Sequence, residues 1–253
     1  MRKILLFING QLGLKVIDFV IKQPDIEISG VVINSTDKRS SGYMENLLRE
    51  YPSLLIFEFS ENLWIQTQFE NVIQDSDLAV SALFGHLIPL SVVEHFGSNI
   101  VNLHPSFLPL GKGSDPIPWA IIENQKQGVS IHVVEGKLDS GPVVAQSQIK
   151  ATFDLTAGDI YELAMNELFK LFKEYIKNWP TEVKFAPQVG EQSFHQTSEL
   201  SMLRNNLARG SAEVERSLRI VQALNFNNGR KCRLRLANGE VWEISLSMTR
   251  VEE

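Results

Sequence analysis

The order of apolar runs in the first 33 residues constrains the fold more than any other feature of this chain. Residues 4–8 form an unbroken apolar run, typical of a buried strand, that stops at Asn9-Gly10. From residue 13 to 22 the apolar residues recur near helical spacing, and residues 26–33 form a second β-rich run. A strand, a helix and a strand in this order imply a βαβ unit with a parallel sheet. We therefore predict an α/β fold with an open, mostly parallel sheet.

The same alternation continues less regularly to about residue 179. Further strands are predicted at 54–57, 77–83, 99–103, 129–134 and 143–149, and helices at 43–49, 64–73, 90–95, 116–123 and 156–178. The tail has a different character. Residues 180–198 have little periodicity and are predicted to be a connection, followed by a helix over 211–223 with Ser211 as its N-cap. Strands at 232–236 and 241–247 flank Asn238-Gly239, a strong hairpin signal, so we predict an α/β domain over 1–179 and a small helix and hairpin region within 180–253.

Composition excludes several classes of function. Apolar residues make up 43% of the chain and charged residues 21%, the balance of a globular protein with an ordinary core. The single cysteine, Cys232, cannot form an internal disulfide, and the apolar run at the N-terminus is too short for a signal peptide. No later stretch is long enough to span a bilayer, so we expect a cytoplasmic protein without a membrane partner. The formal net charge of −6 argues against sequence-independent binding to nucleic acid, but it allows a small anionic ligand.

The segment over residues 102–109, Asn-Leu-His-Pro-Ser-Phe-Leu-Pro, carries the clearest chemical signal. It begins at the end of a predicted strand, where open α/β sheets place their sites. Alternation along the strand puts Asn102 and His104 on the same side, and Pro105 then restricts His104 to an extended conformation. We therefore expect an amide and an imidazole to point together into the site.

A second segment, residues 136–143, reads Gly-Lys-Leu-Asp-Ser-Gly-Pro-Val. It places Asp139 in a tight turn between two predicted strands. Taken alone, such an aspartate most often caps its own turn, and a lone histidine before a proline is most often structural. The conjunction of the two segments in one chain favours a functional interpretation of both.

Together the two segments resemble the formyltransferase family, which includes glycinamide ribonucleotide transformylase, methionyl-tRNA formyltransferase and the sugar N-formyltransferases. The family pattern is an Asn, any residue, His-Pro-Ser and a Leu-Pro pair, then a strand with a second histidine, then Asp-any-Gly-Pro/Asp-Ile/Val. This chain has the same order within residues 77–149, with His132 in the intervening strand. The resemblance implies a Rossmann-like sheet of the formyltransferase type and 10-formyltetrahydrofolate as the formyl donor.

The resemblance implies that Asn102, His104 and Asp139 form the catalytic set, and the chemistry supports these roles. When an amine attacks a formyl carbon, negative charge builds on the carbonyl oxygen, which the Asn102 amide and a donating His104 can stabilise. The imidazole can also relay the amine proton, since the pKa of histidine is near neutrality. Asp139 would orient or charge-stabilise the imidazole. The reaction needs no metal, and no Cys/His spacing typical of metal ligands is present.

By resemblance, the folate lies near residues 83–89, an apolar run with one glycine that suits a flat pterin. The predicted cofactor-binding residues are Leu83, Phe84, Gly85, Leu87, Ile88 and His132. Two alternatives stay open at this point. The run also fits a packed strand-to-helix loop, and His132 also fits a supporting place in the core.

The predicted contacts with the acceptor are Gly10, Ser106, Lys112, Gly113 and Trp119. In the family, the loop that here spans residues 110–121 leads into a helix near the sugar and usually contains Gly-Arg-Gly. Lys112 keeps the charge of that arginine but loses its bidentate fork, so it either meets a diphosphate or lies in solvent. Ser106 either donates to a ligand or caps its turn, and Trp119 either packs on the sugar or nucleotide or belongs to the core.

Length and charge favour one branch of the family. Glycinamide ribonucleotide transformylases end near the long helix, and methionyl-tRNA formyltransferases carry a larger second domain and usually a basic surface. We therefore predict a homodimeric sugar N-formyltransferase acting on a dTDP- or GDP-linked 4-amino-4,6-dideoxy sugar for surface polysaccharide such as lipopolysaccharide O-antigen. The alternatives are a formyltetrahydrofolate hydrolase, which shares the Asn-His-Asp set, and a catalytically silent nucleotide-sugar binding protein.

Overall fold

The computed structural model describes residues 1–34, 43–152, 155–181, 183–204, 214–224, 232–235 and 241–244. The chain divides into two compact units that interleave in sequence. The first unit contains Met1–His104, Ile131–Ala145 and Phe169–Ala186, and the second contains Pro105–Ser130, Gln146–Leu168 and Pro187–Glu253. The sequence prediction had divided the chain once, at residue 179.

The main sheet has seven strands in the order β3-β2-β1-β4-β5-β7-β8. Its strands are β1 (Arg2–Ile8), β2 (Ile26–Ile33), β3 (Ile56–Glu58), β4 (Leu78–Ala82), β5 (Ile100–His104), β7 (Gly128–Val133) and β8 (Val143–Gln148). The first five pair in parallel, as the βαβ pattern predicted. Val134 N–H donates to the carbonyl of Ile100 at the start of β5, so β7 runs back along β5. The fold is therefore a mixed, mostly parallel sheet of the α/β class, as predicted.

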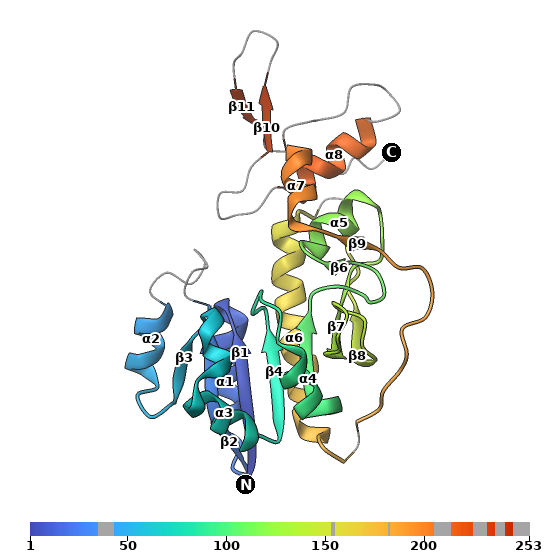
Figure 1. The fold of residues 1–253 in the computed structure, drawn as a ribbon. Coiled ribbons are helices and arrows are strands. Elements are labelled where there is room, and N and C mark those ends of the chain that lie inside the picture. The colour runs from blue at the N-terminus through green and yellow to red at the C-terminus, as the bar shows by residue number, and fades with distance from the viewer. Residues whose placement is uncertain are drawn as a thin grey trace. The chain divides into compact units, whose positions relative to one another are not determined.

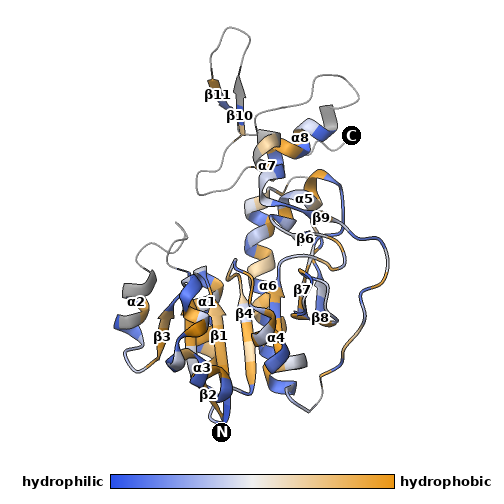
Figure 2. Cartoon of the chain, viewed as in Figure 1, coloured by the Kyte–Doolittle hydropathy of each residue, from blue (hydrophilic) through white to orange (hydrophobic). Residues whose placement is uncertain are grey.

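Apolar side chains of the first unit's strands pack against helices, and Figure 2 shows the strands as predominantly hydrophobic. Leu5 and Phe7 of β1 share one core cluster with side chains of η2 (Glu61–Ile65), α3 (Thr67–Gln74) and α4 (Leu90–Phe96). Phe19 of α1 (Gly10–Ile21) makes edge contacts with Phe169 and Phe172 of α6 (Ala157–Asn178). The helix α2 (Tyr43–Glu50) follows β2 along the chain (Figure 1). The sheet edge that carries the site is thus fixed by a core on the central strands.

The second unit contains shorter elements. Residues of β6 (Lys112–Gly113) pair in parallel with β9 (Phe194–His195), and α5 (Pro116–Ile122) packs against α8 (Val214–Ala223). A further helix, α7 (Thr197–Arg204), follows β9 directly. The strands β10 (Cys232–Arg235) and β11 (Val241–Ile244) form the predicted antiparallel hairpin.

Two predictions of local structure were wrong. The helix predicted over 64–73 is two elements, η2 and α3, because Gln66 takes an extended conformation between them with φ −78° and ψ 123°. The connection predicted over 180–198 contains β9, and α7 begins at Thr197. The predicted N-cap Ser211 and the turn Asn238-Gly239 lie outside the described residues. Within the described part of the chain, no helix has the length and apolar character needed to cross a bilayer.

Candidate active site

The end of β5 presents two of the predicted catalytic side chains. Asn102 pairs with Ser81 of β4 in the parallel ladder, and His104 is the last residue of the strand. The ring of His104 is buried, with 5% of the residue exposed. Because the carboxyl ends of parallel strands form one edge of the sheet, Asn102 and His104 lie where open α/β folds bind their ligands.

Asp139 reaches this edge through the loop between β7 and β8. Its φ of 48° is left-handed, a conformation that aspartate tolerates better than most residues. Gly141 brings the loop against β7, since a Cβ atom there would lie 2.0 Å from the carbonyl oxygen of Val133. The absence of a side chain at Gly141 therefore allows the approach that buries Asp139, of which 7% is exposed.

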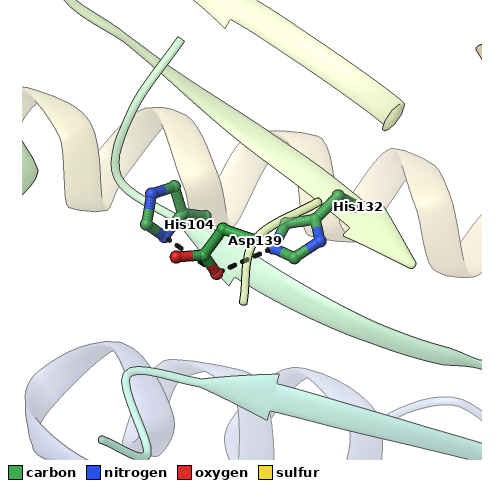
Figure 3. A group of neighbouring side chains, drawn as sticks. All are labelled: His104, His132 and Asp139. Atoms are coloured by element: carbon green, nitrogen blue, oxygen red, sulfur yellow. Dashed lines mark ion pairs between the residues drawn. The ribbon is translucent and has the colours of Figure 1, made fainter. Parts of the chain in front are cut away.

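The Asp139 carboxylate lies between two imidazole rings (Figure 3). Its Oδ1 atom is 3.8 Å from Nδ1 of His104 and 3.4 Å from Nε2 of His132. The structure thus brings the predicted pair His104 and Asp139 together in the first unit. Little water separates the carboxylate from the two rings, because all three side chains are buried.

His132 takes a more central place than the sequence indicated. Its Nδ1 atom lies 2.8 Å from the carbonyl oxygen of Val133, so the proton on Nδ1 donates to the backbone. Its Nε2 atom then faces Asn102 Nδ2 at 3.3 Å and Asp139 Oδ1 at 3.4 Å. In the neutral ring Nε2 accepts from Asn102, and in the charged ring it donates to Asp139. The ring therefore links the two other polar groups of the site.

A polar network in the second unit holds the turn that follows His104. Ser130 Oγ donates to the carbonyl of Ser106 at 2.7 Å and accepts from the N–H of Leu108 at 3.1 Å. Gln146 Nε2 donates to Ser130 Oγ and to the carbonyl of Leu108. Ser106 Oγ donates to Leu110 O at 2.8 Å, which is the turn-capping alternative. Sequence reasoning missed Ser130 and Gln146, because a serine and a glutamine in two separate strands have no spacing that marks them as partners.

The loop of the predicted acceptor site is fixed by segment 192–195 of the same unit. Gly113 has φ 85°, and a Cβ atom there would lie 2.3 Å from the carbonyl oxygen of His195. Lys112 is buried, and its Nζ atom donates to Gln192 Oε1 at 3.0 Å. The lysine therefore does not lie in solvent, and its contact with a diphosphate stays a prediction.

Trp119 is buried in α5 and stacks on His195 with ring centroids 3.7 Å apart and an angle of 7° between the planes. The two ring nitrogens of His195 lie 2.9 Å from Glu123 and 3.0 Å from Glu199. A backbone hydrogen bond from Gln196 and the His195 ring lower the pKa of the Glu199 carboxyl below 4.5. Sequence reasoning missed His195, because nothing in the irregular segment 180–198 indicated that it would meet α5.

The predicted folate run has mixed exposure in the first unit. Phe84 is 1% exposed and packs on Phe7, whereas Leu87 is 76% exposed. Leu83 and Gly85 both have left-handed φ, 59° and 81°, and Ile88 packs against the core cluster. The run is thus partly a packed loop and partly an exposed edge. Gly10, predicted to meet the acceptor, has φ 61° at the start of α1 and lies within the first unit.

A cavity of about 380 Å³ lies in the first unit, at the helix α4 that follows this run along the chain. It is lined by α4 and the end of β7, among others by Leu90, Val93, Val134, Glu135 and Gly136. The lining is mostly apolar, and the volume is within the range of small-ligand sites. Glu135 and Gly136 belong to the loop that carries Asp139, so the cavity and the carboxylate share one structural element.

Comparison with known proteins defines the class of this protein. The family model for formyl transferases matches residues 2–174, which is more than half of the chain, and the chain belongs to this family. A methionyl-tRNA formyltransferase from Mycoplasma genitalium is 26% identical over 204 residues. That match covers 77% of this chain and 64% of the relative, so the chain spans less than two thirds of the relative's length.

Solved structures of similar fold include several N-formyltransferases. A 4-N formyltransferase from Francisella tularensis has a TM-score of 0.84 at 16% identity, covering 99% of both chains. A sugar N-formyltransferase from Shewanella sp. has a TM-score of 0.81 at 17% identity, covering 100% of this chain and 99% of that one. An N-formyltransferase from Helicobacter canadensis, in complex with folinic acid and dTDP-3-aminofucose, has a TM-score of 0.66 at 15% identity over 93% and 89% of the chains. At these identities the likeness establishes the fold.

Proposed function

We propose that this chain transfers a formyl group from 10-formyltetrahydrofolate to the amino group of a nucleotide-linked amino sugar. The observation that carries the proposal is the buried Asp139 carboxylate between His104 and His132, with Asn102 next to the second ring. Family membership supports the formyl chemistry. The near-complete overlap with a sugar N-formyltransferase, C-terminal elements included, supports a sugar amine as acceptor.

We assign the steps of the reaction to three groups, Asn102, His104 and Asp139. The Asn102 amide has two N–H donors, and one of them reaches Nε2 of His132. The second can meet the formyl oxygen, where negative charge builds as the amine attacks. His104 takes the proton that the amine loses, and Asp139 stabilises the resulting imidazolium. His104 then gives this proton to N10 of the folate as the bond between N10 and the formyl carbon breaks, so tetrahydrofolate leaves with a protonated nitrogen. Preorganised donors and a buried counter-charge lower the barrier because no solvent has to reorganise.

For the formyl donor, we propose that the pterin occupies the cavity beside α4, with Leu87 covering it from the folate run. Gly136 offers a direct test, because a Cβ atom there would meet only Leu90 at 3.5 Å, an ordinary contact. Gly136→Val would extend into the cavity, so we expect a higher KM for the folate and an unchanged KM for the sugar. Ser98→Ala, which changes another lining residue of the same cavity without adding bulk, is the matched control. An unchanged KM for the folate in Gly136→Val would contradict the proposal that the pterin binds in this cavity.

The experiment that tests the proposed function is a formylation assay with 10-formyltetrahydrofolate and a panel of dTDP-, GDP- and UDP-linked amino sugars, read by mass spectrometry. The panel includes methionyl-tRNA, because a relative with that activity matches 77% of the chain. A gain of one formyl mass on a nucleotide sugar supports the proposal. Formylation of methionyl-tRNA alone, or release of formate without any acceptor, contradicts it.

Two further expectations stay predictions. The same panel identifies the nucleotide and the position of the amine on the sugar. We expect a 4-amino-4,6-dideoxy sugar that is used for surface polysaccharide. Assembly as a homodimer rests on the hairpin of β10 and β11, whose turn lies outside the described residues. A monomeric mass by light scattering would contradict it.

A further inference from the structure

Three side chains with metal-binding atoms converge in the first unit. One nitrogen each of His104 and His132 and one carboxylate oxygen of Asp139 all lie within 4.8 Å of one another. All three residues are buried. They come from β5, β7 and the following loop, so no sequence spacing of the kind seen in zinc motifs announces them.

The distances fit a tetrahedral ion. With metal–ligand bonds of about 2.0–2.1 Å, neighbouring ligand atoms of a tetrahedral Zn²⁺ site are about 3.4 Å apart. The carboxylate oxygen of Asp139 lies 3.4 Å from His132 Nε2 and 3.8 Å from His104 Nδ1. Only the approach of the two rings to each other requires a closing movement. A fourth position stays open for water, as in zinc sites with three protein ligands.

The second contact of His132 points the same way. Histidines that bind metals almost always donate their other ring N–H to a carbonyl or carboxylate, which fixes the tautomer and directs the bare nitrogen at the ion. His132 makes this bond, from Nδ1 to the carbonyl of Val133 at 2.8 Å. Its Nε2 atom is thereby directed at the Asp139 carboxylate, and an ion bound by both residues would lie between these two groups.

We propose that His104, His132 and Asp139 form a Zn²⁺ site, and that Zn²⁺ bound there reversibly inhibits formyl transfer. The inhibitory part rests on the proposed function, whereas the binding part does not. A bound ion occupies the His104 nitrogen that faces Asp139 and uses the carboxylate as its own ligand. Because the ion occupies both groups, His104 and Asp139 are no longer available to accept and stabilise the amine proton, so formyl transfer stops.

A second cluster of similar composition provides an internal contrast. His195 also meets two carboxylates, but Glu123 lies at Nε2 and Glu199 at Nδ1. The two carboxylates therefore lie at opposite nitrogens of one ring and do not converge on a single ion. The residue types of the two clusters are similar, but only in the cluster of His104, His132 and Asp139 do the ligand atoms converge on one point.

The test is a Zn²⁺ titration of the tag-free full chain against a chromophoric chelator, with Co²⁺ as a spectroscopic probe. We expect one equivalent of Zn²⁺ and the intense visible bands of tetrahedral Co²⁺. His132→Asn and Asp139→Asn should each weaken Zn²⁺ binding by at least about tenfold, the order found for losing a supporting contact of a metal site. His95→Gln, an exposed histidine of α4, and His195→Gln should bind Zn²⁺ like the wild type. Thermal unfolding of each variant checks that the fold is retained.

The outcomes separate the two proposals. Equal Zn²⁺ affinity in wild type and in the folded His132→Asn variant overturns the site. Zn²⁺ bound at the site without inhibition, or with activation, overturns the inhibitory role. The inhibitory role is supported if a chelator reverses the inhibition. It is also supported if, between Co²⁺ and Zn²⁺, the ion that binds more weakly also inhibits more weakly. A chain that binds Zn²⁺ as expected and formylates nothing with chelator present leaves the site standing and overturns the proposed function.

Discussion

Replacing Asp139 by asparagine tests the catalytic geometry most directly, because the substitution keeps size and polarity and removes only the charge. The carboxylate lies 3.8 Å from Nδ1 of His104 and is 7% exposed, so water screens the pair little. At an effective dielectric constant of about 20, opposite charges at this distance attract by about 4 kcal/mol. If that attraction acts mainly on the imidazolium formed during proton transfer, its loss lowers kcat by about 10³-fold. The KM for either substrate should change little.

The assay is steady-state formyl transfer with both substrates varied, together with thermal unfolding of each variant. Asp25→Asn is the matched control, since this aspartate pairs with Arg2 at an exposed position far along the chain from the site. We expect the control to keep wild-type kcat. A folded Asp139→Asn protein with less than a tenfold loss of kcat would refute the reasoning and would favour a purely structural role for the turn.

Three further substitutions test elements that support the site. Gly141→Ala puts a Cβ atom 2.0 Å from a strand carbonyl and should lower the free energy of unfolding more than Gly97→Ala does. At Gly97 nothing lies within 4 Å, so the added Cβ atom there is disfavoured only by the left-handed φ. Denaturant unfolding of the two variants measures the difference. Ser130→Ala removes three hydrogen bonds from a fully buried position and should lower the free energy of unfolding by about 1–3 kcal/mol in the same assay. A smaller loss would mean that water replaces the hydroxyl in the network. For Glu199, the folded-state pKa lies below 4.5, so its stabilising effect is present above that pH and is lost as pH falls through the lowered pKa. Glu199→Gln should therefore be less stable than wild type at about pH 7, and the difference should shrink as pH falls through the lowered pKa of Glu199. A difference that stays constant as pH falls would exclude this linkage.

Much of the sheet was predictable because its signals are local. The apolar run of β1 and the helical spacing that follows identify a βαβ unit without any knowledge of distant contacts. The break between η2 and α3 was not predictable in the same way, since the apolar spacing continues through Gln66 while its backbone is extended. The strand β9 is two residues long and exists through its pairing with β6, and such tertiary pairing leaves no periodicity.

The site shows the same division. Asn102 and His104 share a strand, so alternation alone placed them on one side. That His104 and Asp139 meet was implied by family resemblance, and physical reasoning from sequence could not have shown it, because the meeting depends on how closely Gly141 approaches Val133. The contacts of His132 with Asn102 and Asp139 depend on the register of β7 against β5. Register across separate segments is a property of the folded sheet.

Left-handed backbone conformations occur in three of the segments proposed to form the site. Among the described residues, those with left-handed φ that are not glycine are Leu83, Asp115, Asn124 and Asp139. Leu83 is the least tolerant of the four, and it stands at the start of the predicted folate run. Asp115 precedes α5 in the predicted acceptor loop, and Asp139 carries the carboxylate proposed to act in catalysis. A left-handed conformation costs about 1–3 kcal/mol and persists only where the surroundings fix it. Three of the four strained positions thus lie in segments assigned to donor, acceptor and catalysis, which is expected if the fold gives up stability there to hold side chains in place.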